Sequence, residues 1–186
     1  MNKILLAFLA IAILLGLSFA ASYNNLVSHN QKVDLAWAQV DTQYQRRFDL
    51  IPNLVSSVQG EMKQEQKIFS DIAAARTQYS GATSANDKAL AATNLEGTLG
   101  RLLVIMENYP TLKSNENVTR LMDELAGTEN RISVERSRFN DQVTAYNLLV
   151  IRFPGNLLAQ LFGFSSRDFF QSTAGADTAP KVELNP

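Results

Sequence analysis

An uncharged apolar run close to the start of the chain constrains its fold more than any other feature. Residues 4–21 follow Lys3 without one charged side chain, and almost all of them are apolar. A run of about 18 or more apolar residues can cross a bilayer as a helix, whereas a cleavable signal peptide usually has a shorter apolar stretch that ends in small residues. We therefore predict that residues 1–22 form a transmembrane anchor.

Two further features bear on how this anchor is used. Ser18 and Ala20 are spaced like a signal-peptide cleavage site, so a cleaved, exported soluble protein is an open alternative. Lys3 places positive charge before the run, while the first charges after it are Lys32 and Asp34. This asymmetry predicts a cytoplasmic N-terminus and a domain outside the cytoplasm.

Size and composition limit the rest of the chain to one domain and exclude several functions. The chain has 186 residues, of which 46% are hydrophobic and 19% charged, with a formal net charge of -1 and no cysteine. A near-neutral charge balance gives no electrostatic footprint for nucleic acid. Without cysteine the chain can form no disulfide and no thiolate metal site, and it has no thiol nucleophile.

Apolar residues spaced three and four apart predict long amphipathic helices after the anchor. Such stripes run over residues 26–79, 90–106 and 118–153. No stretch shows the sustained alternation of polar and apolar residues that is expected of a strand. The sequence therefore predicts an all-α fold.

Turn residues and helix caps mark the ends of these helices. Residues 80–84 form a small-residue turn whose last serine, together with Asp87, resembles a capping arrangement for a second helix. That helix should stop before Pro110, and Ser114 with Asn115 and Glu116 should open a third helix. The proline and glycine at 154–155 should end it.

The number of helices depends on Pro52, which lies inside the first stripe. Proline lacks an N–H and crowds the carbonyl four residues back, so the helix should kink or restart here, with Asp49 as a candidate cap. A break would even out the helix lengths, but residues 49–53 are too apolar and glycine-free for a reversal loop. Both alternatives stay open. We predict an elongated antiparallel bundle of three to four long helices over residues 23–170, followed by a disordered tail at 171–186.

Few residues are placed for catalysis or metal binding. His29 is the only histidine and is expected on the surface, because a metal site needs several convergent ligands. Glu124, Glu129 and Glu135 are distributed along one helix beside arginines, a pattern typical of a solvated surface with salt bridges. No Gly-rich phosphate loop, Gly-x-Ser-x-Gly elbow or His-Glu-x-x-His pattern occurs. We therefore predict no catalytic residue, no metal and no cofactor.

The most informative polar residues surround Pro52 and recur in the third helix. They are Arg46, Arg47, Asp49 and Asn53, with Glu129 and Arg131 as candidate partners. Because adjacent helix positions cannot all face one neighbour, some of these side chains should face outward. The cluster is expected to contain either a buried arginine–carboxylate pair that locks the helix near Pro52 or a docking surface for a partner.

A glycine in the third helix predicts close packing. Gly127 inside a helix costs about 1 kcal/mol relative to alanine. We therefore expect another helix to approach closely at this point, within the bundle by default, with a partner protein as the alternative.

The segment after the third helix is too apolar for a free tail. Its candidate contact residues are Leu157, Leu158, Leu161, Phe162 and Phe164. We expect them to form a lid packed on the end of the bundle. The alternative is contact with the lipid interface or with a membrane partner, if the last helix returns toward the anchor.

Several segments of the chain resemble the LemA family. They are YNNLV (23–27), AW (36–37), RRFDLIPNLV (46–55), ENYP (107–110), LAGTENRI (125–132) and FPGNLLA (153–159). The resemblance runs from the anchor to about residue 170 and keeps the order and spacing of these blocks. It implies a single-pass bacterial membrane protein with a helical bundle and no established activity. It also suggests links to membrane proteolysis or envelope maintenance, with a membrane metalloprotease as a partner to look for.

The predicted function is a membrane-anchored scaffold or adaptor rather than an enzyme. Its long helices would contact a membrane protein partner, or a second copy of the chain, in the manner of a coiled coil, and the N-terminal helix would contact lipid. The alternative is a small-ligand-binding or enzymatic helical domain. That alternative predicts a sizeable cavity lined by convergent polar groups.

Overall fold

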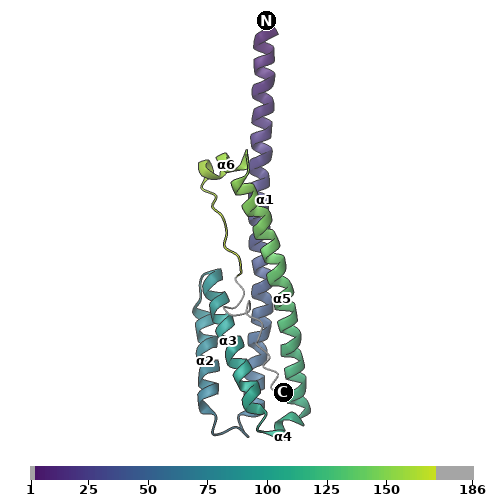
Figure 1. Ribbon diagram of the computed structural model, residues 1–186, viewed down its shortest axis with the longest axis vertical. Helices are drawn as coiled ribbons and strands as arrows, with labels where there is room; N and C mark the ends of the chain where they lie inside the picture. Colours follow the sequence, from purple (N-terminus) through teal and green to yellow (C-terminus); the bar gives the residue numbers. More distant parts are fainter. Residues whose placement is uncertain (1–2, 171–186) are drawn as a thin grey trace, which may run out of the picture. The chain divides into compact units, whose positions relative to one another are not determined.

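The computed structural model describes residues 3–170 and is built from helices joined by turns and loops (Figure 1). The helices are α1 (Lys3–Val58), α2 (Gln66–Gly81), α3 (Ala85–Met106), α4 (Pro110–Lys113), α5 (Glu116–Ile151) and α6 (Gly155–Phe162). The described residues contain no strand, which confirms the predicted all-α class. The tail predicted at residues 171–186 lies outside the described part of the chain.

Two compact units divide the chain, and two helices contribute to both. The first unit, here the anchor unit, contains residues 3–42 and 132–169, and therefore the first part of α1, the second part of α5, and α6. The second unit, here the bundle unit, contains residues 43–131, and therefore the end of α1, α2, α3, α4 and the start of α5.

In the anchor unit, α1 changes from an exposed helix to a packed one. Every residue from 3 to 20 is exposed, and this stretch is long and apolar enough to cross a membrane. Packing begins at Leu26, which is buried, and continues at Val33 and Val40. The matching face of α5 buries Val143 and contributes the Phe139 ring, which lies against Trp37 of α1 with 5.8 Å between ring centroids. One face of α1 therefore packs only after its apolar run has ended.

The extended segment that follows α6 is attached to both long helices of the anchor unit. The side-chain amide of Asn147 on α5 donates to the Arg167 carbonyl at 2.9 Å, and the Arg167 N–H donates to Asn147 Oδ1 at 2.8 Å. The Arg167 guanidinium also pairs with Asp34 of α1. These contacts hold the extended segment against α1 and α5 at Arg167.

Pro52 does not break the first long helix, because α1 continues through it to Val58. Ile51, Leu54 and Val58 are each at most 1% exposed, so burial on both sides of the proline stabilises helical backbone here. The alternative of a restarted helix is therefore wrong, and Asp49 is an exposed residue within α1 rather than a cap.

The reversal lies one turn later, in residues 59–65. The stripe over residues 26–79 is therefore shared by two helices, because α1 ends at Val58 and α2 begins at Gln66. Gly60 lies in this turn, and Met62 is buried there although it is outside any helix. The stripe therefore continues in the sequence while the backbone turns.

Helices α2 and α3 lie side by side in the bundle unit (Figure 1), with a short turn between them. The predicted cap is confirmed, because the Asp87 N–H donates to Ser84 Oγ at 3.0 Å. At the start of α5, Asn115 Oδ1 accepts a hydrogen bond from the Asn117 N–H at 3.0 Å. The helix therefore opens within the three residues, 114–116, that were predicted to start it.

Two glycines give opposite predictions for stability. A Cβ on Gly127 would meet nothing within 4 Å, so the expected close approach of a helix within the bundle is wrong. A Cβ on Gly155 would overlap the backbone carbonyl of Leu149.

Gly127→Ala should stabilise the fold by about 0.5–1 kcal/mol through helix propensity, whereas Gly155→Ala should lower the melting temperature. Thermal denaturation of the detergent-solubilised chain, followed by circular dichroism, measures both. A loss of stability in Gly127→Ala would contradict the open packing at this position.

Candidate functional site

A buried arginine joins three helices of the bundle unit. Arg47 of α1 is 8% exposed, and its guanidinium pairs with Glu129 of α5 and with Glu96 of α3, the latter at 3.4 Å. We call these three residues the Arg47 tie. Of the two carboxylates, Glu96 is the more buried, with 20% of its side chain exposed against 44% for Glu129.

The position of Arg47 explains why it needs partners. It lies on the buried stripe of α1 between Tyr44 and Ile51, both of which are 1% exposed. A guanidinium removed from water at such a place is costly unless carboxylates pair with it. Glu129 was a predicted partner. Glu96 was not, because an acidic residue that stands apart from other charges among the leucines of α3 gives no sequence signal of pairing.

The other members of the predicted cluster face outward. Arg46, Asp49 and Asn53 are exposed, and their spacing of three and four residues places them on one side of α1. Arg131 is exposed on α5. The structure therefore brings Arg47 and Glu129 together inside the bundle unit and leaves a separate polar surface on α1, formed by residues 46, 49 and 53, which we call the outer α1 face.

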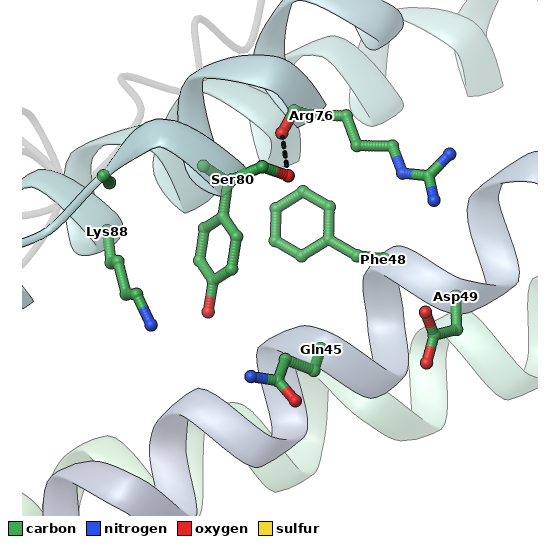
Figure 2. A pocket seen from close by; sticks show the side chains of 8 residues that line it. Gln45, Phe48, Asp49, Arg76, Ser80 and Lys88 are labelled. Carbon is green, nitrogen blue, oxygen red and sulfur yellow. Dashed lines mark hydrogen bonds between the residues drawn. The ribbon is translucent and has the colours of Figure 1, made fainter.

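A pocket of about 400 Å³ opens beside this face (Figure 2). Gln45, Phe48 and Asp49 of α1 line one side, and Arg76, Tyr79, Ser80, Ala82 and Lys88 line the other. The floor is aromatic, with the Phe48 and Tyr79 ring centroids 4.1 Å apart. The Lys88 ammonium lies 5.6 Å from the centroid of the Tyr79 ring, within reach of a cation–π contact.

The chemistry of this pocket suits binding more than catalysis. Its volume lies within the range of small-molecule sites, about 300–1,000 Å³. Two aromatic rings between Arg76, Lys88 and Asp49 could hold a flat ligand or an extended side chain. Among the described residues, no group of three or more histidine, aspartate or glutamate side chains is placed to hold a metal ion.

The apolar segment after α5 divides into buried and exposed residues. Leu158 is 3% exposed and Phe164 is half-buried, as a lid requires. Leu157, Leu161 and Phe162 are exposed, as a contact surface requires. The Phe162 ring nevertheless lies 4.8 Å from the Tyr23 ring of α1, centroid to centroid.

His29 was expected on the surface, but the structure leaves it half-buried. Its Nδ1 atom is buried and has no hydrogen-bond partner within the described part of the chain. Burial, and then the nearby charge of Lys32, hold the pKa of His29 below its usual value of 6.5. The imidazole is therefore neutral near pH 7.

Neighbouring arginines provide a matched test of the Arg47 tie. Arg47→Ala removes the guanidinium that pairs with Glu96 and Glu129 in a partly buried setting and should destabilise the fold by about 1–3 kcal/mol. Arg46→Ala changes an exposed side chain and should stay within about 0.5 kcal/mol of the parent. Chemical denaturation of both variants gives the two values. Equal effects would contradict the tie, and a double-mutant cycle with Glu129→Gln would then show no coupling.

The only histidine makes stability depend on pH in a defined direction. In the unfolded chain the imidazole of His29 has its usual pKa of 6.5, and in the folded chain its pKa is lower. Because the unfolded chain then binds the proton more readily, the free energy of unfolding should fall as the pH drops below 6.5. His29→Gln should remove that part of the dependence. A proton NMR titration of the imidazole checks the cause directly, and a pKa at or above 6.5 would contradict it.

Curated relatives of the chain are magnetosome proteins. The MamQ 1 and MamQ 2 proteins of Paramagnetospirillum magneticum (strain AMB-1) are each 26% identical to it over 92% of this chain and 74% of theirs. MamQ of Magnetospirillum gryphiswaldense (strain MSR-1) is 35% identical over 43% of this chain and 29% of its own.

The family comparison covers most of the chain, because the LemA family model matches residues 36–184. This range includes the Arg47 tie, the outer α1 face, the pocket and α6. With its N-terminal apolar helix, the molecule is a membrane-associated helical protein. The chain belongs to the LemA family.

Proposed function

We propose that this protein is a membrane-anchored helical scaffold that acts through contacts with other proteins. The observation that carries the proposal is α1, which presents an exposed apolar surface over residues 4–20 and then buries one of its faces, first in the anchor unit and then in the bundle unit. Such a helix holds a folded domain at a membrane. The proposal includes a single pass through the inner membrane, with the domain outside the cytoplasm and no catalytic role.

The outer α1 face is the proposed partner surface. Arg46, Asp49 and Asn53 offer a cation, a carboxylate and an amide in one row. The neighbouring Arg47 is buried and pairs with carboxylates inside the bundle unit. The partner is a membrane protein, with a membrane metalloprotease as one candidate class and a second copy of this chain as another. A role at a magnetosome, as named for the MamQ proteins, is one form that this function would take here.

The pocket supports a second candidate function. Its aromatic floor and mixed charges would bind a small ligand, or one side chain of a partner, beside the outer α1 face. Because Asp49 belongs to both, the partner would fill the pocket if the scaffold function is correct.

Site-specific photocrosslinking in the native cell tests the scaffold function. A photoreactive residue at Asn53 should capture one defined membrane protein, or a second copy of the chain, and mass spectrometry should identify it. The matched control carries the same residue at Arg120, which is exposed on α5. Arg46→Glu should abolish capture from Asn53 while the fold is retained.

Equal capture from both positions, or none from Asn53, would contradict a partner surface on α1. In that case, saturable binding of a small molecule that is lost in Lys88→Ala would favour the pocket as the functional site.

A further inference from the structure

We propose that α6 is an interfacial helix whose exposed apolar side lies on the bilayer surface beside the anchor. The protein would then touch lipid at two places, through the spanning part of α1 and through α6. This inference rests on α1 remaining in the membrane, which the proposed function also requires.

The position of α6 along α1 is the first observation. The apolar run ends at residue 21, and Tyr23 follows it by two residues, or about 3 Å of helix rise. The ring of Phe162, at the end of α6, lies 4.8 Å from the Tyr23 ring, and the Phe164 ring lies 6.1 Å from it. Aromatic side chains gather at this level of membrane proteins, where the hydrocarbon meets water. Figure 1 shows α6 beside α1, just below the N-terminal part of α1 that no other helix contacts.

The second observation is that α6 has three different sides. Successive residues of a helix are about 100° apart, which separates its side chains into groups. Gly155, Leu158 and Ala159 are buried against the anchor unit. Asn156 and Gln160 form a polar side, and Leu157 and Leu161 form an apolar side that is 47% and 73% exposed. A helix with distinct polar and apolar outer sides is typical of one that lies in the plane of a membrane surface.

The third observation is the distribution of charge. Residues 153–166 carry no charged side chain, and Arg152 and Arg167 flank them. Ile151 and Phe153 beside the helix are 63% and 79% exposed, which extends the apolar surface. An arginine at the border of an apolar segment can keep its guanidinium group among lipid phosphates while the segment meets the acyl chains. The exposed Arg152 is placed for this role, whereas Arg167 pairs with Asp34 of α1.

Continuity with the anchor identifies lipid as the occupant of this surface. The ring contacts with Tyr23 hold one end of α6 within about one helical turn of the bilayer edge that the apolar run defines. A second protein at this level would have to displace lipid headgroups that already surround the anchor. The exposed leucines therefore face the medium that the adjoining segment of α1 already occupies.

Single-cysteine labelling of the full chain tests this inference, because the protein has no native cysteine. An environment-sensitive fluorophore is attached at Leu157→Cys, Leu161→Cys, Gln160→Cys or Leu9→Cys, and each variant is reconstituted into vesicles of phosphatidylethanolamine and phosphatidylglycerol. Gln160 is the matched control, because it is exposed on the polar side of the same helix. Leu9, within the apolar run, reports whether the anchor lies in lipid.

Labels at Leu157 and Leu161 should shift their emission to the blue and should be quenched by brominated acyl chains, whereas the label at Gln160 should be quenched by aqueous iodide. Labels at both Leu157 and Leu161 are used so that one position can still be measured if the substitution at the other disturbs folding. If Leu157, Leu161 and Gln160 behave alike in water while Leu9 is in lipid, the α6 inference is wrong and the anchored scaffold stands. Aqueous quenching at Leu9 as well would overturn both. A blue shift at Leu161 that persists in detergent without lipid quenching in vesicles would mean a protein contact and would also overturn the inference.

Discussion

The rest of the structure depends on the continuity of one helix. Helix α1 begins as an exposed apolar helix and ends in the bundle unit without an interruption. Boundaries between the parts of a chain usually fall in exposed, flexible linkers that allow independent motion. Here the residue that would enter such a linker, Leu26, is buried in the anchor unit. Attachment to the membrane and packing of the domain are therefore properties of the same helix.

The Arg47 tie shows how this helix organises its neighbours. Hydrophobic burial is non-directional, so a stripe of leucine and valine fixes which face of α1 is inside but not which helix lies at which height. A guanidinium between carboxylates of α3 and α5 adds direction, because its donors point to fixed acceptors. The adjacent Arg46 is exposed and is available for other contacts. One pair of neighbouring arginines thus serves the interior and the outer surface.

The sequence predicted the elements of this fold that local rules determine. The apolar run, the stripes and the cap at Ser84 follow from composition, periodicity and short-range hydrogen bonds, and the structure contains all three. The course of the chain at Pro52 could not be predicted, because local propensity favours a break and only burial of Ile51 and Leu54 outweighs it.

The candidate site was predicted only in part, for similar reasons. Glu129 stood out as a partner because it belongs to a charged segment, but Glu96 becomes recognisable only when α3 packs against α1. The prediction at Gly127 was wrong because a glycine inside a helix has two possible explanations. Another helix can pack closely against it, or the helix can be stable enough to contain a residue of low helix propensity, as here. The orientation of the three sides of α6 became clear only from its contact with Tyr23 of α1, which no local sequence rule predicts. Pairings between distant residues, and the side of a helix that stays uncovered, are set by tertiary packing.

Native-state hydrogen exchange at the amides of Asn53 and Leu54 tests the continuity of α1 most directly. If a helix began at Pro52, these amides would fall in its first turn and would have no intrahelical acceptor. In a continuous α1 they bond to carbonyls of the preceding turn, and Asn53 is informative because its side chain is exposed. The account predicts protection of both amides equal to that at Tyr44 and Phe48. Rapid exchange at Asn53 and Leu54 between protected neighbours would show a break, and the anchor and the bundle unit would then not share one helix.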